Sequence, residues 1–199
     1  METIAVPLER VNTPPYGDGM KKRLEREDWI SAGLRALAAD GVEAVRVERL
    51  AAALKVTKGS FYWHFKDRPA LLAALLDAWK ARATQDVITT VDAGATDPLQ
   101  RLRALFALTV PNDGRLDLAV RAWAAQDVTA QAALDEIDAR RLGYLETQFL
   151  ALGFPAPAAS ARARFAYQAL IGQFMMDKLP PEARAAERLD LILPMLTRL

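Results

Sequence analysis

The sequence contains no cysteine, and His64 is its only histidine. The missing thiols exclude disulfides, thiolate nucleophiles and cysteine-bound metal ions. A single histidine among aromatic and basic neighbours does not supply the several ligands that a metal site needs. No apolar run approaches the roughly 18 residues of a membrane span, and the first residues lack the basic and then apolar stretches of a secretion signal. We therefore expect a cytoplasmic protein with no membrane partner and no bound metal.

The motifs of common enzyme classes are missing as well. The sequence contains no P-loop, no dinucleotide-binding glycine motif and no nucleophile set beside a base. No segment alternates between apolar and polar residues for long enough to predict a strand. The composition, with 52% hydrophobic and 26% charged residues, is that of an ordinary globular protein. We expect no catalytic residues and no cofactor.

The formal net charge of +1 conceals an uneven distribution of charge along the chain. Residues 20–82 hold thirteen Lys and Arg against eight Asp and Glu, a balance of +5, whereas residues 1–19 and 83–199 each have a balance of −2. A basic segment joined to weakly acidic ones is typical of a part that binds a polyanion. A solvated basic face has the same charge, so charge alone leaves both interpretations open.

Apolar spacing and helix-ending residues divide the chain into a tail and two helical domains. Residues 1–19 carry prolines and glycines without apolar periodicity, which predicts a flexible tail. The first predicted helices cover residues 24–40, 47–54, 58–64 and 68–91, and five more helical patterns follow. Gly41 is expected to end the first helix in the left-handed conformation, and Thr57 and Asp67 are expected to cap the third and fourth. We predict an all-α fold of about nine helices, with domains at residues 20–67 and 68–199.

Two short helices joined by a tight turn, with a third helix before them, form a helix-turn-helix unit. Only the second helix of such a pair enters the major groove of DNA. In that helix Phe61 and Phe65 lie four residues apart and are expected to anchor it to the core. Gly59 leaves room for a close approach of another helix or of the duplex. The hydrogen-bonding and stacking side chains of this segment are Thr57, Lys58, Ser60, Tyr62, Trp63 and His64.

This region closely resembles the DNA-binding region of TetR-family regulators. The resemblance rests on Gly41-Val42-Glu43-Ala44, Val47-Glu48-Arg49-Leu50-Ala51, Val56 through Arg68, and Leu71-Leu72. It implies that Thr57, Tyr62 and His64 hold phosphates, that Lys58 and Ser60 reach base edges, that Trp63 contacts a sugar or a thymine methyl, and that Arg68 contacts the DNA backbone. Hydrogen-bonding chemistry agrees, because Lys donates to guanine acceptors and hydroxyls serve either phosphate or base. The basic run at residues 21–23 is either an arm that reaches a minor groove or a solvated tail.

Three residues depart from the family pattern. Arg46 stands where such proteins commonly have a Ser or Thr cap for the second helix, so this cap is predicted to be absent or supplied otherwise. Lys55 stands where the turn usually has glycine, and a lysine at positive φ carries strain. Arg68 replaces the usual lysine. The positive charges are kept, and Arg46 and Lys55 are further candidates for phosphate contacts.

Residues 68–199 offer aromatic side chains on several predicted helices. Such side chains can line a ligand cavity between helices, or they can simply fill the core. Arg121 is the most interesting polar residue near them, although a salt bridge to one of many acids explains it equally well. The ligand expected is mainly apolar or aromatic, with one acidic or carbonyl group. The candidates for contact with it are Phe106, Arg121, Trp123, Tyr144, Gln148 and Tyr167.

The last two predicted helices, residues 158–177 and 182–196, are rich in small or apolar side chains. Two such helices from each protomer can form a four-helix interface, with a closed monomeric core as the alternative. A dimer also suits DNA binding, because two recognition helices set about 34–36 Å apart read a palindrome. We therefore expect a homodimeric repressor, released from a palindromic double-stranded DNA operator by an unidentified small-molecule effector. The alternatives are a ligand-independent activator or architectural DNA-binding protein and, less favoured, an all-helical enzyme.

Overall fold

The computed structural model describes residues 24–176 and 191–198, in which helices and their connections account for the whole backbone and no strand occurs. The helices are α1 (Arg26–Asp40), a 3-10 turn η1 (Val42–Ala44), α2 (Val47–Ala53), α3 (Lys58–Tyr62), α4 (Arg68–Lys80), a π-helical turn η2 (Ala81–Gln85), α5 (Asp86–Gly94), α6 (Pro98–Thr109), α7 (Arg115–Ala124), α8 (Val128–Ala151) and α9 (Ala156–Met176). Residues 191–197 are also helical. The predicted all-α fold is confirmed. Within the described ranges, none of the helices has the length and apolar character needed to cross a bilayer.

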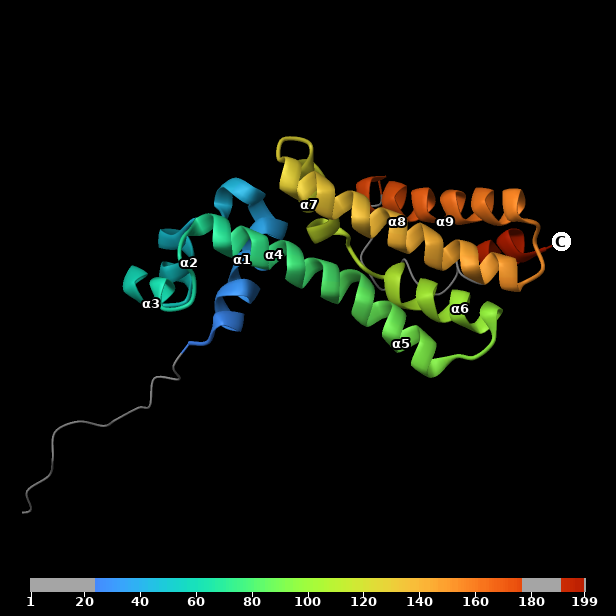
Figure 1. Ribbon diagram of the computed structural model, residues 1–199, viewed down its shortest axis with the longest axis horizontal. Coiled ribbons are helices and arrows are strands. Elements are labelled where there is room, and N and C mark those ends of the chain that lie inside the picture. The colour runs from blue at the N-terminus through green and yellow to red at the C-terminus, as the bar shows by residue number, and fades with distance from the viewer. Residues whose placement is uncertain (1–23, 177–190, 199) are drawn as a thin grey trace, which may run out of the picture.

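The molecule is elongated, with α1, α2 and α3 gathered at one end (Figure 1). We call residues 24–67, which contain these three helices, the head. α4, η2 and α5 follow one another as a single rod that runs from the head along the body, while α8 and α9 lie side by side at the far end (Figure 1). The helix predicted at residues 68–91 is therefore longer than expected, since it continues to Gly94 and contains the π-helical turn.

The buried apolar side chains form two clusters, and the first crosses the predicted boundary between residues 67 and 68. It joins Trp29 and Phe61 of the head to Trp79 of α4, and it also includes Trp123 of α7 and Ile137 of α8. The second cluster lies between α6, α8, α9 and the helix at residues 191–197. Because α7 shares the first core with α1, the head is packed onto the body and is not merely tethered by α4.

The ends of the head's helices show where local sequence rules hold. Asp67 caps α4 as predicted, by accepting a hydrogen bond from the Ala70 N–H at 2.8 Å. Gly41 ends α1 at the predicted place and at positive φ (78°), but its ψ of 180° is not that of the left-handed helix. Lys55 has the positive φ that its place in the turn predicts, 57°. Arg46 precedes α2 without a side-chain capping bond, which confirms the absence of the usual cap.

The prediction that the Thr57 side chain caps α3 is wrong. Thr57 occupies the N-cap position, but its hydroxyl makes no capping hydrogen bond. In a capped helix the threonine hydroxyl would accept a hydrogen bond from the Ser60 N–H. In this five-residue helix the Ser60 N–H instead donates to the Thr57 carbonyl, at 3.1 Å. The hydroxyl is therefore left for a partner outside the head.

Candidate nucleic-acid interface and cavity

α3 is held by aromatic packing on one side and exposes polar groups on the other. Phe61 is fully buried and meets Trp29 edge to face, with ring centroids 5.3 Å apart. Phe65 stacks on Phe61 and is buried as well, so the predicted anchoring pair is confirmed. Tyr62 and Trp63 are 62% and 84% exposed, which is far more than packing alone requires of such large side chains. The helix therefore presents an aromatic and polar surface to whatever binds the head.

The residues predicted to contact DNA lie at the same end of the molecule, but they differ in solvent exposure. Arg46, Lys55, Thr57, Lys58, Gly59, Tyr62 and Trp63 are exposed, whereas Ser60, His64 and Arg68 are partly buried. A Cβ added to Gly59 would meet only the Thr57 hydroxyl oxygen, at an ordinary 3.6 Å. The head itself thus does not require glycine at this position, and the space it leaves faces outward.

Lys58 already has an anionic partner within the head. Its Nζ lies 2.6 Å from Oε1 of Glu48, which projects from α2. The hydrogen bond from Lys58 lowers the pKa of Glu48 below its ordinary value, and the lysine's charge acts in the same direction. Any base or phosphate that takes Lys58 must therefore compete with the Glu48 carboxylate.

Arg68 has a structural role that the sequence did not predict. Its Nε donates to the Val45 carbonyl at 2.7 Å, and a terminal nitrogen donates to the Val42 carbonyl at 2.8 Å. These two bonds fasten the start of α4 to the segment between α1 and α2. The predicted backbone-phosphate contact would have to use the remaining N–H groups.

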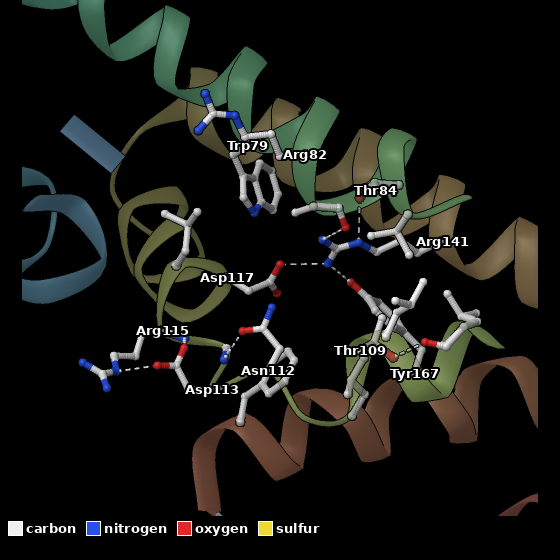
Figure 2. Close-up of a pocket in the computed structure, with 18 of the residues that line it drawn as sticks. Trp79, Arg82, Thr84, Thr109, Asn112, Asp113, Arg115, Asp117, Arg141 and Tyr167 are labelled. Atoms are coloured by element: carbon white, nitrogen blue, oxygen red, sulfur yellow. Dashed lines mark hydrogen bonds and ion pairs between the residues drawn. The ribbon is translucent and has the colours of Figure 1, made fainter. Parts of the chain in front are cut away.

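A cavity of about 480 Å³ lies in the body and extends to the head. Its wall includes residues of α1, α4, η2, α5, α6, α7, α8 and α9, and its size is within the range of about 300–1,000 Å³ typical of small-molecule sites. Figure 2 shows Trp79, Thr84, Arg141 and Tyr167 around this space. Three of the six predicted ligand contacts line it, namely Phe106, Tyr144 and Tyr167.

The other three predicted contacts lie elsewhere. Trp123 packs into the first apolar core, because α7 packs against α1 and α8. Gln148 is buried and its amide donates to the Tyr144 carbonyl one helical turn earlier, at 3.4 Å. Arg121 borders a second hollow of about 410 Å³, which Tyr167 also lines. The predicted contacts thus include three aromatic residues of the cavity wall and none of its charged residues.

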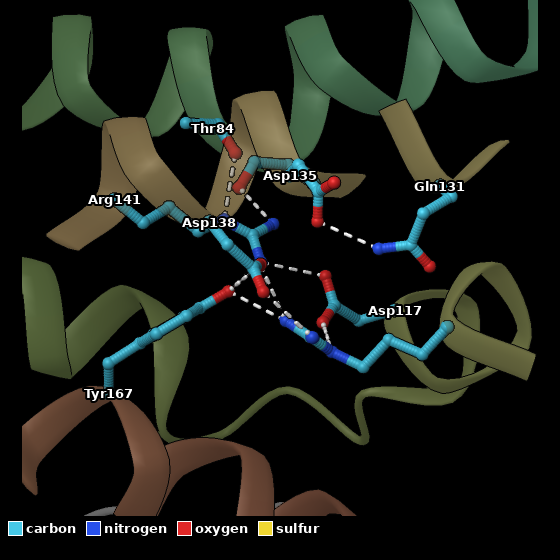
Figure 3. A network of polar contacts seen from close by, with 9 residues as sticks. Thr84, Asp117, Gln131, Asp135, Asp138, Arg141 and Tyr167 are labelled. Atoms are coloured by element: carbon cyan, nitrogen blue, oxygen red, sulfur yellow. Dashed lines mark hydrogen bonds and ion pairs between the residues drawn. The ribbon is translucent and has the colours of Figure 1, made fainter. Parts of the chain in front are cut away.

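A network of polar contacts joins residues that line the two hollows, and Tyr167 lines both of them (Figure 3). Arg121 and Asp138 form a two-pronged ion pair with N–O distances of 2.8 and 3.0 Å. The Tyr167 hydroxyl donates to Asp138 at 2.7 Å, and it accepts from Arg121 at 2.8 Å and from Arg141 at 3.0 Å. The salt-bridge interpretation of Arg121 is thus correct. Burial raises the pKa of Tyr167 to about 12, so the phenol stays protonated.

Arg141 connects this network to the π-helical turn. It donates to the Thr84 hydroxyl at 2.9 Å, to the Ala83 carbonyl at 3.2 Å and to Asp117 at 2.8 Å. Asp117, which is buried, also accepts from Arg121 at 3.2 Å. Burial lowers the pKa of Arg141, but the Asp117 charge and the hydrogen bonds outweigh it and leave the pKa raised. Two arginines and two aspartates therefore balance one another, with Asp117 and Arg141 lining the cavity and Arg121 and Asp138 lining the second hollow.

The sequence held a signal for these residues. Asp117 and Arg121 are four residues apart on α7, and Asp138 and Arg141 are three apart on α8, spacings that place each pair on one helix face. Nothing in the spacing says that the two faces meet. In residues 24–176 and 191–198, no three His, Cys, Asp or Glu side chains are grouped closely enough to hold a metal ion.

Residues 30–75 match the family model described as bacterial regulatory proteins, tetR family. The class G tetracycline repressor of Vibrio anguillarum is 39% identical over 56 residues, 28% of this chain and 27% of that protein. The class C repressor of Escherichia coli is 43% identical over a segment of the same length, 28% of this chain and 26% of that protein. The chain thus covers only about a quarter of either tetracycline repressor.

Solved structures extend the likeness to the fold of most of the chain. The reduced form of E. coli NemR has a TM-score of 0.70 at 19% identity, over 86% of this chain and 95% of its own. AibR in complex with isovaleryl coenzyme A and operator DNA has a TM-score of 0.65 at 20% identity, over 87% of this chain and 98% of its own. The chain thus matches the tetR-family model over residues 30–75, and most of it shares its fold with these two solved structures.

Proposed function

We propose that the protein is a homodimeric transcriptional repressor that binds a palindromic operator through α3 and leaves it when a small molecule binds in the cavity. It acts in the cytoplasm, as a regulator and not as an enzyme. The observation that carries the proposal is the exposed surface of α3, within a segment that matches the tetR-family model. The solved complex of AibR with an acyl coenzyme A and operator DNA shows that this fold accommodates both kinds of partner.

The contacts proposed for DNA follow from the chemistry and exposure of each side chain. Lys58 and Ser60 reach base edges, and Thr57, Tyr62 and His64 hold phosphates. The free Thr57 hydroxyl and the outward tyrosine support these roles. Trp63 contacts a sugar or a thymine methyl, while Arg46, Lys55 and the remaining donors of Arg68 contact phosphates.

The proposed dimer forms through the last two helices. Phe165, Met175 and Met176 of α9 are exposed, and so are Leu191 and Met195 of the final helix. Apolar side chains of this size along two neighbouring helices support a contact with a second copy. The expected helices at residues 158–177 and 182–196 lie partly outside the described residues, and the proposed tail at residues 1–19 and the basic run at residues 21–23 lie wholly outside them. In this proposal residues 20–67 form the DNA-binding domain and residues 68–199 form the domain for the partner and most of the effector site, with Arg68 at its start also contacting DNA.

Selection of bound fragments from a random double-stranded DNA library by the full chain tests the proposal. We expect enrichment of a palindrome whose half-sites are about one helical turn apart. Affinity for it should fall steeply with salt, because several phosphates are neutralised. Enrichment of no sequence would contradict a repressor that recognises an operator. A ligand-independent DNA-binding protein is the second candidate, and the cavity of about 480 Å³ argues against it.

A further inference from the structure

The arginines around the cavity differ in whether a carboxylate neutralises them. Four line it: Arg35, Arg82, Arg115 and Arg141. The last three form ion pairs or charged hydrogen bonds with Glu27, Asp113 and Asp117, respectively. Arg35, on α1, has no such partner anywhere in the described part of the chain. Within the described residues, Arg35, which is exposed, is therefore the one arginine of the cavity wall that no carboxylate pairs with.

The rest of the wall suits an apolar body. Ile88 of α5, Leu105 and Phe106 of α6, and Leu170 and Phe174 of α9 all line the space. The two carboxylates in the wall, Asp113 and Asp117, are both held by arginines. A cationic ligand would have to break one of these pairs, whereas an anion finds Arg35 available. The charge and the apolar lining together favour an anionic ligand with an apolar body over a cationic one.

We propose that the effector is an amphipathic organic acid, with one carboxylate that pairs with Arg35 and an aliphatic or aromatic body between α5, α6 and α9. This inference rests on the proposed function, since it names the chemistry of the molecule that releases the repressor. It also indicates how effector binding can affect the position of the head. Arg35 belongs to α1, and Leu116 of α7 lines the same cavity, so the bound acid touches both sides of the contact between head and body.

Isothermal titration of the full chain, without DNA, tests the proposal. The probes are octanoate and 4-phenylbutyrate, with octanol and octylammonium as controls that keep the aliphatic body and change the head group. We expect saturable binding of both acids, about tenfold weaker binding of octanol, and the weakest binding for octylammonium. Tighter binding of octylammonium than of octanoate, or no saturable binding of either acid, would overturn the proposal.

The variant Arg35→Gln distinguishes the contribution of the Arg35 charge to binding from that of the apolar wall. It should bind octanoate about tenfold more weakly and octanol as the original chain does, which also shows that the cavity is intact. Arg49→Gln is the matched control, because Arg49 is an exposed arginine of the head that does not line the cavity. Equal octanoate affinity in Arg35→Gln and the original chain would overturn the assignment of Arg35. Since no DNA is present, these results and those of the operator selection can fail independently.

Discussion

The Tyr167 hydroxyl joins α9 to the charged centre of the body, and its removal measures what this connection contributes to stability. The oxygen accepts from Arg121 and Arg141 and donates to Asp138, with all three distances at or below 3.0 Å. Tyr167 is 7% exposed, so solvent has little access to replace the lost group. Tyr167→Phe keeps the ring and deletes only these three hydrogen bonds.

The magnitude follows from what the partners retain. A hydrogen bond to a charged group contributes about 1.5–3 kcal/mol. Arg121 and Asp138 still hold each other by two bonds, and Arg141 keeps Asp117 and Thr84, so the three losses do not add. We therefore expect Tyr167→Phe to lower the free energy of unfolding by about 2–3 kcal/mol. For a chain of this size, that lowers Tm by about 5–10 °C.

Thermal unfolding followed by circular dichroism, at one fixed protein concentration, measures this difference. Tyr144→Phe is the matched control, because the Tyr144 hydroxyl donates to Asp92 at 2.7 Å on a partly exposed part of the surface. We expect the control to lower the free energy of unfolding by less than about 1 kcal/mol. Equal destabilisation by the two substitutions would refute the idea that the polar network holds the body together.

The same tyrosine predicts a response to high pH. Burial raises the pKa of Tyr167 to about 12, above the value of 10.0 for an unperturbed tyrosine. Between these values the unfolded chain binds fewer protons than the folded one, so the contribution of Tyr167 is complete below pH 10 and is lost as the pH rises to 12. Tyr167→Phe should therefore lose stability less steeply than the original chain over this interval.

Three further substitutions test other parts of the structure. Glu48→Gln frees Lys58 and removes a negative charge beside α3, so operator affinity measured at low salt should rise by about threefold to tenfold. Gly114→Ala should lower the free energy of unfolding by about 2–4 kcal/mol in denaturant melts, because Gly114 has φ of 67° and an added Cβ would lie 2.1 Å from Phe174 Cγ. Arg68→Lys keeps the charge but replaces the two separate donor nitrogens by one, so the same melts should show a loss of about 1–2 kcal/mol.

Each of these expectations has a result that contradicts it. Unchanged or weaker DNA binding by Glu48→Gln would show that Glu48 does not compete with DNA for Lys58. Gly143→Ala is the control for Gly114, because an added Cβ there meets nothing within 4 Å and replacing a helical glycine stabilises by about 1 kcal/mol. Stabilisation of both glycine variants would refute the close packing of Phe174. An Arg68→Lys variant as stable as the original chain would show that the carbonyl bonds matter little.

Local sequence rules predicted the head well because its signals act over short distances. The helix positions, the aromatic anchor Phe61 and the positive φ of Lys55 all depend on residues within one or two turns. The error at Thr57 is also local. The capping rule identifies the N-cap residue, but it does not say whether the Ser60 N–H donates to the Thr57 hydroxyl or to the Thr57 carbonyl. The long-range role of Arg68 was not predictable, because it depends on how α4 meets η1.

The cavity was only half predictable for a different reason. Trp123 and Phe106 look alike in sequence, as aromatic residues within apolar helical patterns. The structure places Trp123 in the core shared with the head and Phe106 at the cavity, and only the packing of α7 on α1 separates them. Arg141 was missed because its partners come from three helices, 24, 26 and 57 residues away in the chain.

The shared core restricts how a ligand in the body can affect DNA binding. The cavity is lined by Arg35 and Ala38 of α1 and by Leu116 of α7, so a ligand's binding free energy depends on how these two helices are placed. In the proposed function, operator DNA fixes the position of the head, and with it the position of α1. Because coupling between two binding sites is reciprocal, operator DNA must change effector affinity by the same factor by which the effector changes operator affinity. A ligand that fills the cavity but binds both head positions equally well would leave the DNA affinity unchanged, however tightly it binds.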